Sequence, residues 1–341
     1  MEKELLTLSD GAVINEYTLQ NNRGVTIKLL NRGGIITSIV TPDKDGIPGD
    51  IVLGYDTIEP YLENPAYFGA IIGRVTNRIS GATFKIDGTE YKIPSPFEKY
   101  ALHGGITGFD KKVWDAKPYK TSDEQGVELT CLSVDGEEGF PGNLEARVIY
   151  RLTNENEFIT EYFATTDKPT HVNLTNHAYF NLSGKEHVLD QRVLILADKM
   201  LATDENILPT GEYLPVANTA FDFRKMQAIG DRINETEVGY DHCYVFDKPA
   251  NEMAPVAKTY DPNSGRVMEV YTTYPTLQFY TGNYLKGITG KKQQSYQNHG
   301  AFCMETQLYP DAANRPEFPS TLLTPENFYS HSTILRFGVA E

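Results

Sequence analysis

Short runs of alternating apolar and polar residues, separated by turn signals, recur along the chain and limit the folds available to it. Residues 82–93, ATFKIDGTEYKI, hold two such runs around Asp87-Gly88, a pair typical of a type I′ hairpin turn because both positions take positive φ. Residues 144–166 repeat the pattern around a Thr-Asn-Glu-Asn loop, and residues 266–283 are again aromatic and β-branched. A short stretch at 228–235 is an exception with helical character. The sequence therefore predicts an all-β protein, a large antiparallel β-sandwich.

The chain of 341 residues can bury a large core. Length alone favours two domains, but all-β folds of about 200 residues or more often form one unit. No linker rich in Pro, Ser or Gly, no low-complexity tract and no repeat of fixed period divides the sequence. We therefore expect a single domain over residues 1–341.

The net charge and the cysteine content limit the classes of ligand that the protein can bind and the compartment in which it occurs. A net charge of −15 repels nucleic acid, anionic membrane surfaces and phosphorylated metabolites at long range, so a small neutral ligand fits better. The three cysteines are widely spaced with no CxxC pair, which argues against a disulfide framework or a zinc knuckle. Residues 1–11 lack the apolar core of a signal peptide, and no stretch has the length of a membrane span. We expect a cytoplasmic protein.

Residues 173–182, NLTNHAYFNL, have an unusual polar face when read as a strand. Every residue on that face can hydrogen-bond, yet none is Lys, Arg, Asp or Glu. A histidine in a strand is often structural, but this row of neutral partners favours His177 as an acid–base group beside a polar ligand. His171 and His177 would lie roughly 20 Å apart, too far to share a metal ion. The face consists of Asn173, Thr175, His177, Tyr179 and Asn181, with His171 before them.

Glu305 is the only formal charge between Lys292 and Asp311, and its neighbours are mostly apolar. An isolated carboxylate in a core strand is costly unless it is paired or functional. It is either a structural group bonded to backbone or arginine, or a general base whose pKa is raised by burial.

Five further residues have the hydrogen-bonding character that a sugar requires, although each alone can be structural. His103 precedes two glycines in LHGGITGFD, a loop that lets backbone approach a ligand closely. Phosphate loops, the HExxH zinc motif and the GxSxG nucleophile elbow are absent from the sequence. The mechanism that remains is acid–base catalysis, in which a histidine and a carboxylate act on an uncharged polar ligand. The five residues are Asn77, Arg78, His103, Asp241 and Gln278.

Nine segments resemble the aldose 1-epimerases, or galactose mutarotases, in family order across nearly the whole chain. NLTNHAYFNL and METQLYPDAANRPEFPS are long enough to be specific, whereas LHGG alone is weak. The resemblance implies one large β-sandwich domain, with His177 as general acid, Glu305 as general base, and Asn77, Arg78, His103, Asp241 and Gln278 as sugar-binding residues. The other segments are GRVTNRI, DGEEGFPGNL, LPTGEYLPV, GYDHCY, QFYTGN and LRF.

The resemblance implies interconversion of the α and β anomers of a free aldohexose, galactose or glucose, with no metal or other cofactor. The expected protein is a monomer or homodimer. Its productive form needs Glu305 ionised and His177 protonated; mutual attraction favours these charges and burial opposes them. Three alternatives remain open from the sequence. They are an epimerase of phosphorylated hexoses, a glycoside hydrolase using Asp241 with Glu305, and a non-catalytic sugar-binding protein.

Overall fold

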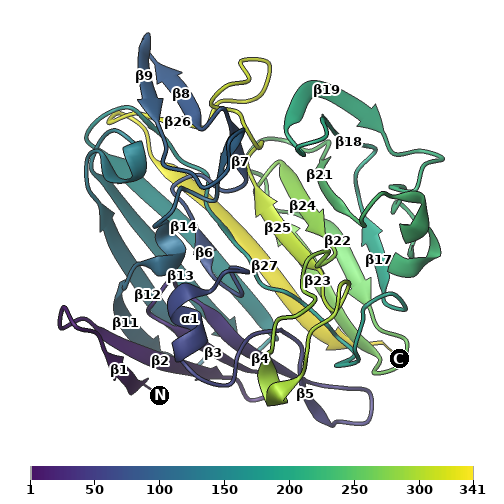
Figure 1. The fold of residues 1–341 in the computed structure, drawn as a ribbon. Coiled ribbons are helices and arrows are strands. Elements are labelled where there is room, and N and C mark those ends of the chain that lie inside the picture. Colours follow the sequence, from purple (N-terminus) through teal and green to yellow (C-terminus); the bar gives the residue numbers. More distant parts are fainter. Residues whose placement is uncertain (1, 341) are drawn as a thin grey trace.

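The alternating runs at 144–166 form a hairpin within a nine-stranded antiparallel sheet in the computed structural model, which describes residues 2–340. Side chains of β13 are alternately buried and exposed or half-buried, as in a strand with one face on a core. The loop has three residues, one fewer than predicted, because Thr153 still belongs to β13. The C-terminal strand β27 pairs with β14 and β23 in the middle of the sheet (Figure 1). In sheet order the strands are β11 (Asp115–Lys120), β12 (Glu124–Ser133), β13 (Leu144–Thr153), β14 (Glu157–Thr166), β27 (Tyr329–Val339), β23 (Arg266–Thr272), β22 (Ala254–Tyr260), β17 (Arg192–Ile195) and β20 (Gln227–Ala228).

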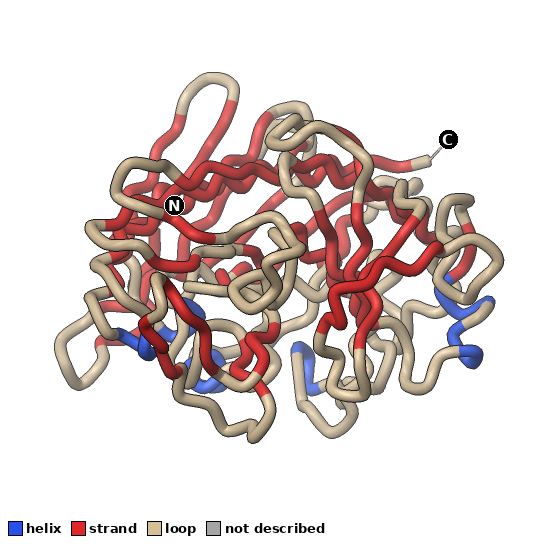
Figure 2. The backbone as a smooth tube through the Cα atoms, turned by 90° about the horizontal axis from the view of Figure 1, so that it is seen from above, coloured by secondary structure: helices blue, strands red, loops and turns tan. Residues whose placement is uncertain are grey.

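Two five-stranded sheets form a second layer on one face of this sheet. One core cluster joins Leu29 of the first sheet and Phe279 of the second to Val148 and Val270 of the nine-stranded sheet. The prediction of an antiparallel β-sandwich is therefore confirmed, and strands dominate the view from above (Figure 2). The first sheet contains β1 (Glu2–Thr7), β2 (Val13–Gln20), β3 (Thr26–Leu30), β4 (Ile36–Pro42) and β5 (Pro48–Asp50). The second, in sheet order, contains β19 (Pro209–Pro215), β18 (Lys199–Thr203), β21 (Asp241–Val245), β24 (Thr276–Tyr280) and β25 (Cys303–Gln307).

Short elements connect the sheets. The predicted hairpin at 82–93 is confirmed, with φ of 50° at Asp87 and 80° at Gly88 as a type I′ turn requires. The helical stretch at 228–235 consists of two 3₁₀ turns, η3 (Ile229–Asp231) and η4 (Ile233–Glu235). The remaining strands form the pairs β7 (Arg78–Ser80) with β10 (Tyr100–Leu102), β8 (Thr83–Ile86) with β9 (Thr89–Lys92), β6 (Ile71–Ile72) with β16 (Thr175–Asn176), and β15 (Thr170–His171) with β26 (Leu322–Leu323). The remaining helical turns are α1 (Glu59–Glu63), η1 (Phe109–Lys111), η2 (Glu137–Gly139) and η5 (Lys291–Gln293).

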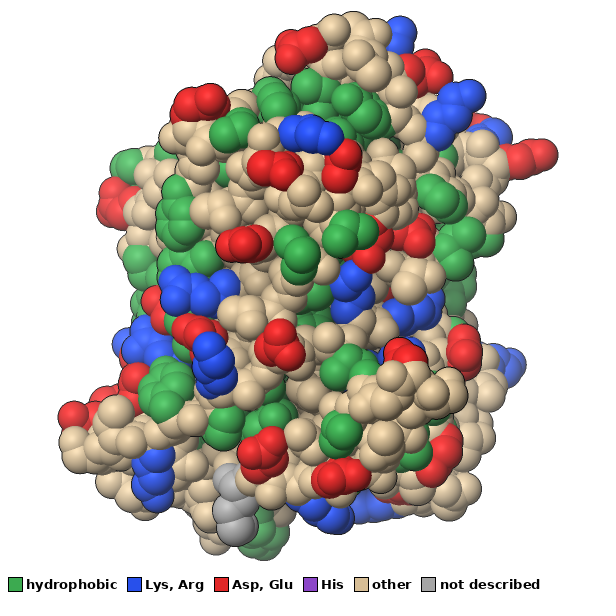
Figure 3. Space-filling view, turned by 90° about the vertical axis from the view of Figure 1, so that its left-hand side faces the viewer, with side chains coloured by type: hydrophobic (Ala, Val, Ile, Leu, Met, Phe, Trp, Pro, Cys, Tyr) green, Lys and Arg blue, Asp and Glu red, His purple; other side chains and the backbone are tan. Residues whose placement is uncertain are grey.

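Acidic and basic side chains are interspersed over the face shown in Figure 3, with apolar side chains between them. This mixture differs from the continuous basic stripe that typifies a nucleic-acid interface. Within residues 2–340, no helix combines the length and apolarity needed to cross a membrane.

Candidate active site

Strands β21, β24 and β25 carry two cross-strand rows of Asp, Gln, Glu, Tyr and Cys side chains on one face, and four of these six residues are buried. Residues that are paired across neighbouring strands point to the same side, so the register determines these rows. The intervening residues Phe279 and Met304 point the other way, into the core. Hydrophobic packing beneath the sheet thus fixes the polar groups above it. The rows are Asp241–Tyr280–Cys303 and Cys243–Gln278–Glu305.

His177 reaches the same place from the 173–182 segment, which runs antiparallel beside β25. Phe180 and Phe302 exchange backbone hydrogen bonds of 2.7 and 2.9 Å. Counting three residues from that bridge along each segment brings His177 level with Glu305. The His177 Nε2 atom lies 3.7 Å from Glu305 Oε1, and both side chains are about 95% buried or more. The two predicted catalytic residues therefore meet in space.

The interpretation of 173–182 as one continuous strand was wrong for most of its length. Only Thr175 and Asn176 form a regular strand there, and every residue except Asn176 is buried. The segment lies between β25 and residues 51–76, so water reaches neither edge. The Asn173 amide exchanges hydrogen bonds with the Leu308 backbone, and the Asn181 amide donates to Gly300 O. These amides replace missing backbone partners, which explains their abundance better than ligand binding does.

The His177 ring lies between two tyrosine rings. The Tyr179 centroid is 4.9 Å away at an interplanar angle of 18°, and the Tyr67 centroid is 6.1 Å away at 20°. The Sγ atom of Cys303 lies 3.5 Å from Nδ1, the ring nitrogen that does not face Glu305. Neither Tyr67 nor Cys303 was predicted to belong to the site, and Tyr67 gives no local signal because only tertiary packing brings it to the histidine.

The five predicted binding residues form one hydrogen-bonded network. Asn77 Nδ2 donates to Gln278 Oε1 at 3.2 Å, and Gln278 Nε2 donates to Asp241 Oδ1 at 2.6 Å. Arg78 forms an ion pair with Asp241 at 3.4 Å, and the Asn77 backbone N–H donates to His103 Nδ1 at 3.2 Å. The network holds the five side chains in fixed orientations around one cavity.

His103 has a defined tautomer because its Nδ1 accepts a hydrogen bond. A neutral ring then carries its proton on Nε2. Burial, with help from His177 and Arg78, lowers the His103 pKa well below its usual value, so the ring is neutral. The loop is tight: His103 has φ of 53°, and a Cβ on Gly104 would lie 1.9 Å from Gly73 O. The predicted close approach at this glycine is to backbone rather than to ligand.

These side chains surround a cavity of about 410 Å³, of a size suited to a small molecule. All seven predicted site residues line it. Tyrosine rings and aliphatic side chains complete the wall, so hydrogen-bonding groups and apolar surface occur side by side, as a pyranose requires. The additional lining residues are Pro65, Ala66, Tyr67, Leu102, Tyr179, Tyr280, Tyr284, Leu285 and Ile288.

Burial dominates the protonation of the Glu305–His177 pair. Desolvation raises the Glu305 pKa well above its usual value, with a further increase from Asp241 that Arg78 partly offsets. Desolvation lowers the His177 pKa to about 4. Both shifts favour a resting pair of protonated Glu305 beside neutral His177. The form with Glu305 ionised and His177 protonated has the same number of protons and is reached by moving one proton across the pair.

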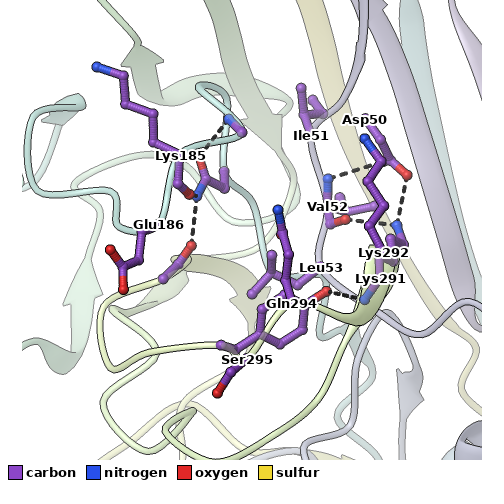
Figure 4. A pocket seen from close by; sticks show the side chains of 14 residues that line it. Asp50, Ile51, Val52, Leu53, Lys185, Glu186, Lys291, Lys292, Gln294 and Ser295 are labelled. Atoms are coloured by element: carbon purple, nitrogen blue, oxygen red, sulfur yellow. Dashed lines mark hydrogen bonds and ion pairs between the residues drawn. The ribbon is translucent and has the colours of Figure 1, made fainter.

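The 284–300 loop contributes residues to the wall of this cavity and to the wall of a second cavity of about 350 Å³, shown in Figure 4. Tyr284 lies at the first cavity, and Lys291 lies at the second. Lys291 Nζ donates to Asp50 Oδ2 and to Val52 O, each at 2.8 Å (Figure 4). Tyr296 OH donates to Gly54 O at 2.8 Å. The loop that forms one wall of the active-site cavity is thus anchored to residues 50–54.

Comparison with known proteins identifies the family. A profile of the family described as aldose 1-epimerase matches residues 15–336. Galactose mutarotases of Bos taurus and Homo sapiens are each 43% identical to this chain, covering 98% and 97% of it and 97% and 96% of their own lengths. A crystal structure described as a GalM/aldose epimerase homologue from C. elegans superposes with a TM-score of 0.90 at 29% identity, over 96% of this chain and 99% of that one. The chain therefore belongs to the aldose 1-epimerase family, isomerases that interconvert the α and β anomers of aldoses.

Proposed function

We propose that Glu305 and His177 are the base and acid of mutarotation of free aldohexoses, galactose and glucose among them. The observation that carries this proposal is the distance of 3.7 Å between a buried carboxyl group, which can act as a base, and a buried imidazole, which can act as an acid, in the wall of one cavity. Glu305 removes the proton from the C1 hydroxyl while His177 donates one to the ring oxygen. The C1–O5 bond breaks and leaves an aldehyde. After rotation about C1–C2 the same residues, with roles reversed, close the ring.

The network around the pair holds the sugar and stabilises developing charge. His103 Nε2–H donates to a sugar oxygen, since Nδ1 is already occupied. Asn77, Gln278 and Asp241 bind hydroxyl groups, and Arg78 supports negative charge on oxygen in the transition state. The tyrosine faces contact the C–H surface of the ring. The network is formed before the sugar binds, which reduces the ordering cost of the reactive complex.

A neutral sugar fits the cavity better than a phosphorylated one. Among the described residues that line it, Arg78 carries the one permanent positive charge, and Asp241 already pairs with it. A phosphate group would meet Asp241 and Glu305 without a cluster of cations to balance it. The relatives named galactose mutarotase support galactose as a substrate.

Residues 1–341 form one domain in this proposal. Support comes from the largest of the four core clusters that the described residues form, whose members range from Tyr17 to Phe337 and include side chains of all three large sheets.

Polarimetry tests the proposed function. Freshly dissolved α-D-galactose should reach its normal final rotation faster with protein than without, and galactose 6-phosphate should show at least tenfold lower kcat/KM. Release of galactose from a glycoside, with no effect on the rotation of the free sugar, would contradict the proposal and favour hydrolysis.

A further inference from the structure

A buried thiol lies beside the catalytic pair, and the proposed mechanism does not use it. Cys303 is fully buried and is two residues before Glu305 on β25, so both side chains point to the same face. Its Sγ atom lies 3.5 Å from Nδ1 of His177. Sulfur, imidazole nitrogen and carboxylate oxygen therefore converge at one corner of the cavity.

This donor set matches a thiophilic divalent cation. Each of the three side chains offers one ligand atom within 4.8 Å of the other two. Tetrahedral Zn²⁺ with bonds of about 2.0 to 2.3 Å holds its ligands roughly 3.3–3.7 Å apart. The ion binds one ring nitrogen only, so the 3.7 Å from Nε2 to Glu305 and the 3.5 Å from Nδ1 to Cys303 do not both apply to one site. With one ligand atom from each residue within 4.8 Å of the others, no pair has to close by more than about 1.5 Å. Within residues 2–340, this is the one such group of three His, Cys, Asp or Glu side chains.

The corner is reached from solvent. His177 and Glu305 line the cavity of about 410 Å³, while Cys303 lies behind them. An ion entering from the cavity would meet the histidine and the carboxylate first and the thiol last. Its fourth position would face the cavity, where a water molecule can occupy it.

We propose that Cys303, His177 and Glu305 form an inhibitory site for a thiophilic divalent cation of the Zn²⁺ or Cd²⁺ class. The bound ion occupies the lone pairs with which Glu305 would accept a proton and His177 would carry one. The Cys303 thiol proton and the Glu305 carboxyl proton leave to solvent as the thiolate and the carboxylate bind the ion. The ion and the sugar compete for the same two side chains. Inhibition rests on the function proposed above, whereas ion binding does not.

Binding is measured with Cd²⁺ added to the metal-free full-length protein. An ultraviolet sulfur-to-cadmium charge-transfer band should develop with wild type and with Cys131→Ser, whose cysteine lies on the nine-stranded sheet at β12. The band should be absent from Cys303→Ser and from Cys303→Ala, and excess galactose should weaken it in wild type. A band that persists in a folded Cys303 variant would overturn the site. If neither Cys303 variant folds, the site is overturned by a wild-type band whose intensity does not change when galactose is added.

Inhibition is measured with Zn²⁺ by polarimetry. Zn²⁺ should raise the apparent KM for galactose in wild type, and its inhibition constant should weaken at least tenfold in Cys303→Ser but not in Cys131→Ser. Comparing each variant with and without Zn²⁺ removes any difference in basal rate. Activation by Zn²⁺, or equal inhibition of Cys303→Ser, would overturn the proposal. A metal-free wild type that does not speed mutarotation, yet shows a Cys303-dependent Cd²⁺ band, would instead refute the proposed function alone.

Discussion

Glu305 lies 3.7 Å from His177, and burial keeps the proton of this pair on the carboxyl group rather than on the imidazole. The two residues come from β25 and from an irregular segment packed beside it, so neither strand alone defines the site. The reactive arrangement, with charges on both groups, is a less populated form with the same proton count. This relationship determines how activity depends on pH.

Activity should follow a bell-shaped pH profile. Its acid limb should come from the histidine and its alkaline limb from the carboxyl group, the reverse of the order that their ordinary pKa values would give. Adding a proton to the resting pair titrates His177, whose pKa is about 4, and gives the acid limb. Removing the proton titrates Glu305, whose pKa is well above its usual value, and gives the alkaline limb. The measurement is kcat/KM for galactose against pH, which reports on the free enzyme.

The His177→Asn variant distinguishes this order from the usual one. Its residual activity needs ionised Glu305 alone, so kcat/KM should rise with pH through the raised Glu305 pKa, without an alkaline limb. The surviving limb should therefore lie at higher pH than the wild-type acid limb. A surviving limb at the wild-type position would mean that Glu305 is ionised in the resting enzyme.

Glu305→Gln should lower kcat by about 10²–10⁴-fold while the protein stays folded, because the amide keeps the shape but cannot accept the proton. Burial raises the folded-state pKa of Glu305, so its wild-type contribution to stability is fully present below the unfolded-state pKa and is lost as pH rises through the folded-state value. At pH 8 the variant should therefore have a Tm no lower than wild type. Near-normal kcat would rule out Glu305 as the base.

Gly104→Ala should destabilise the loop that holds His103. A methyl group there would lie 1.9 Å from Gly73 O, and φ of 93° is unfavourable for alanine. Gly88→Ala is the matched control, since φ is 80° and no atom lies within 4 Å of the added carbon. We expect Gly88→Ala to cost about 1–2 kcal/mol with little change in kcat/KM. Gly104→Ala should cost more and lower kcat/KM at least tenfold; equal effects of the two on activity would contradict the role of this loop.

Lys291→Met should loosen the wall formed by the 284–300 loop. The variant removes the ion pair with Asp50, which keeps its backbone N–H donors Ile39 and Val52, and it removes the bond to Val52 O. We expect KM for galactose to rise severalfold with a smaller change in kcat, because Tyr284 and its neighbours line the cavity without belonging to the Glu305–His177 pair. The exposed neighbour Lys292 serves as control, and Lys292→Met should leave steady-state kinetics unchanged. A Lys291→Met enzyme with wild-type KM would show that the anchor is dispensable.

Much of the fold follows from the sequence because period-two patterns and turn residues are local signals. The 82–93 and 144–166 hairpins are examples. Glu305 stood out because a lone carboxylate among apolar residues needs a reason. The 173–182 segment misled the interpretation because its alternation resembles a strand with one polar face. Its two edges are covered by residues distant in sequence, and no local pattern reveals that both sides are buried.

The site was predicted unevenly for the same reason. His103, Asn77, Arg78, Asp241 and Gln278 were named for their hydrogen-bonding character, and the family resemblance added their sugar-binding role, since each alone reads as an ordinary polar residue. The structure adds the network that joins them. Two features had no signal in the sequence: Tyr67, which stacks on His177, and the Lys291 anchor.

A double-mutant cycle on Glu305 and His177 tests the central claim most directly, that the two act as one acid–base pair on a single sugar. Polarimetry at one pH gives kcat for wild type, Glu305→Gln, His177→Asn and the double variant. If the residues act as a unit, the double variant should be about as slow as the slower single variant, because the second substitution removes nothing that remains in use. Losses that multiply, with each single variant lowering kcat independently of the other, would contradict the proposed pair.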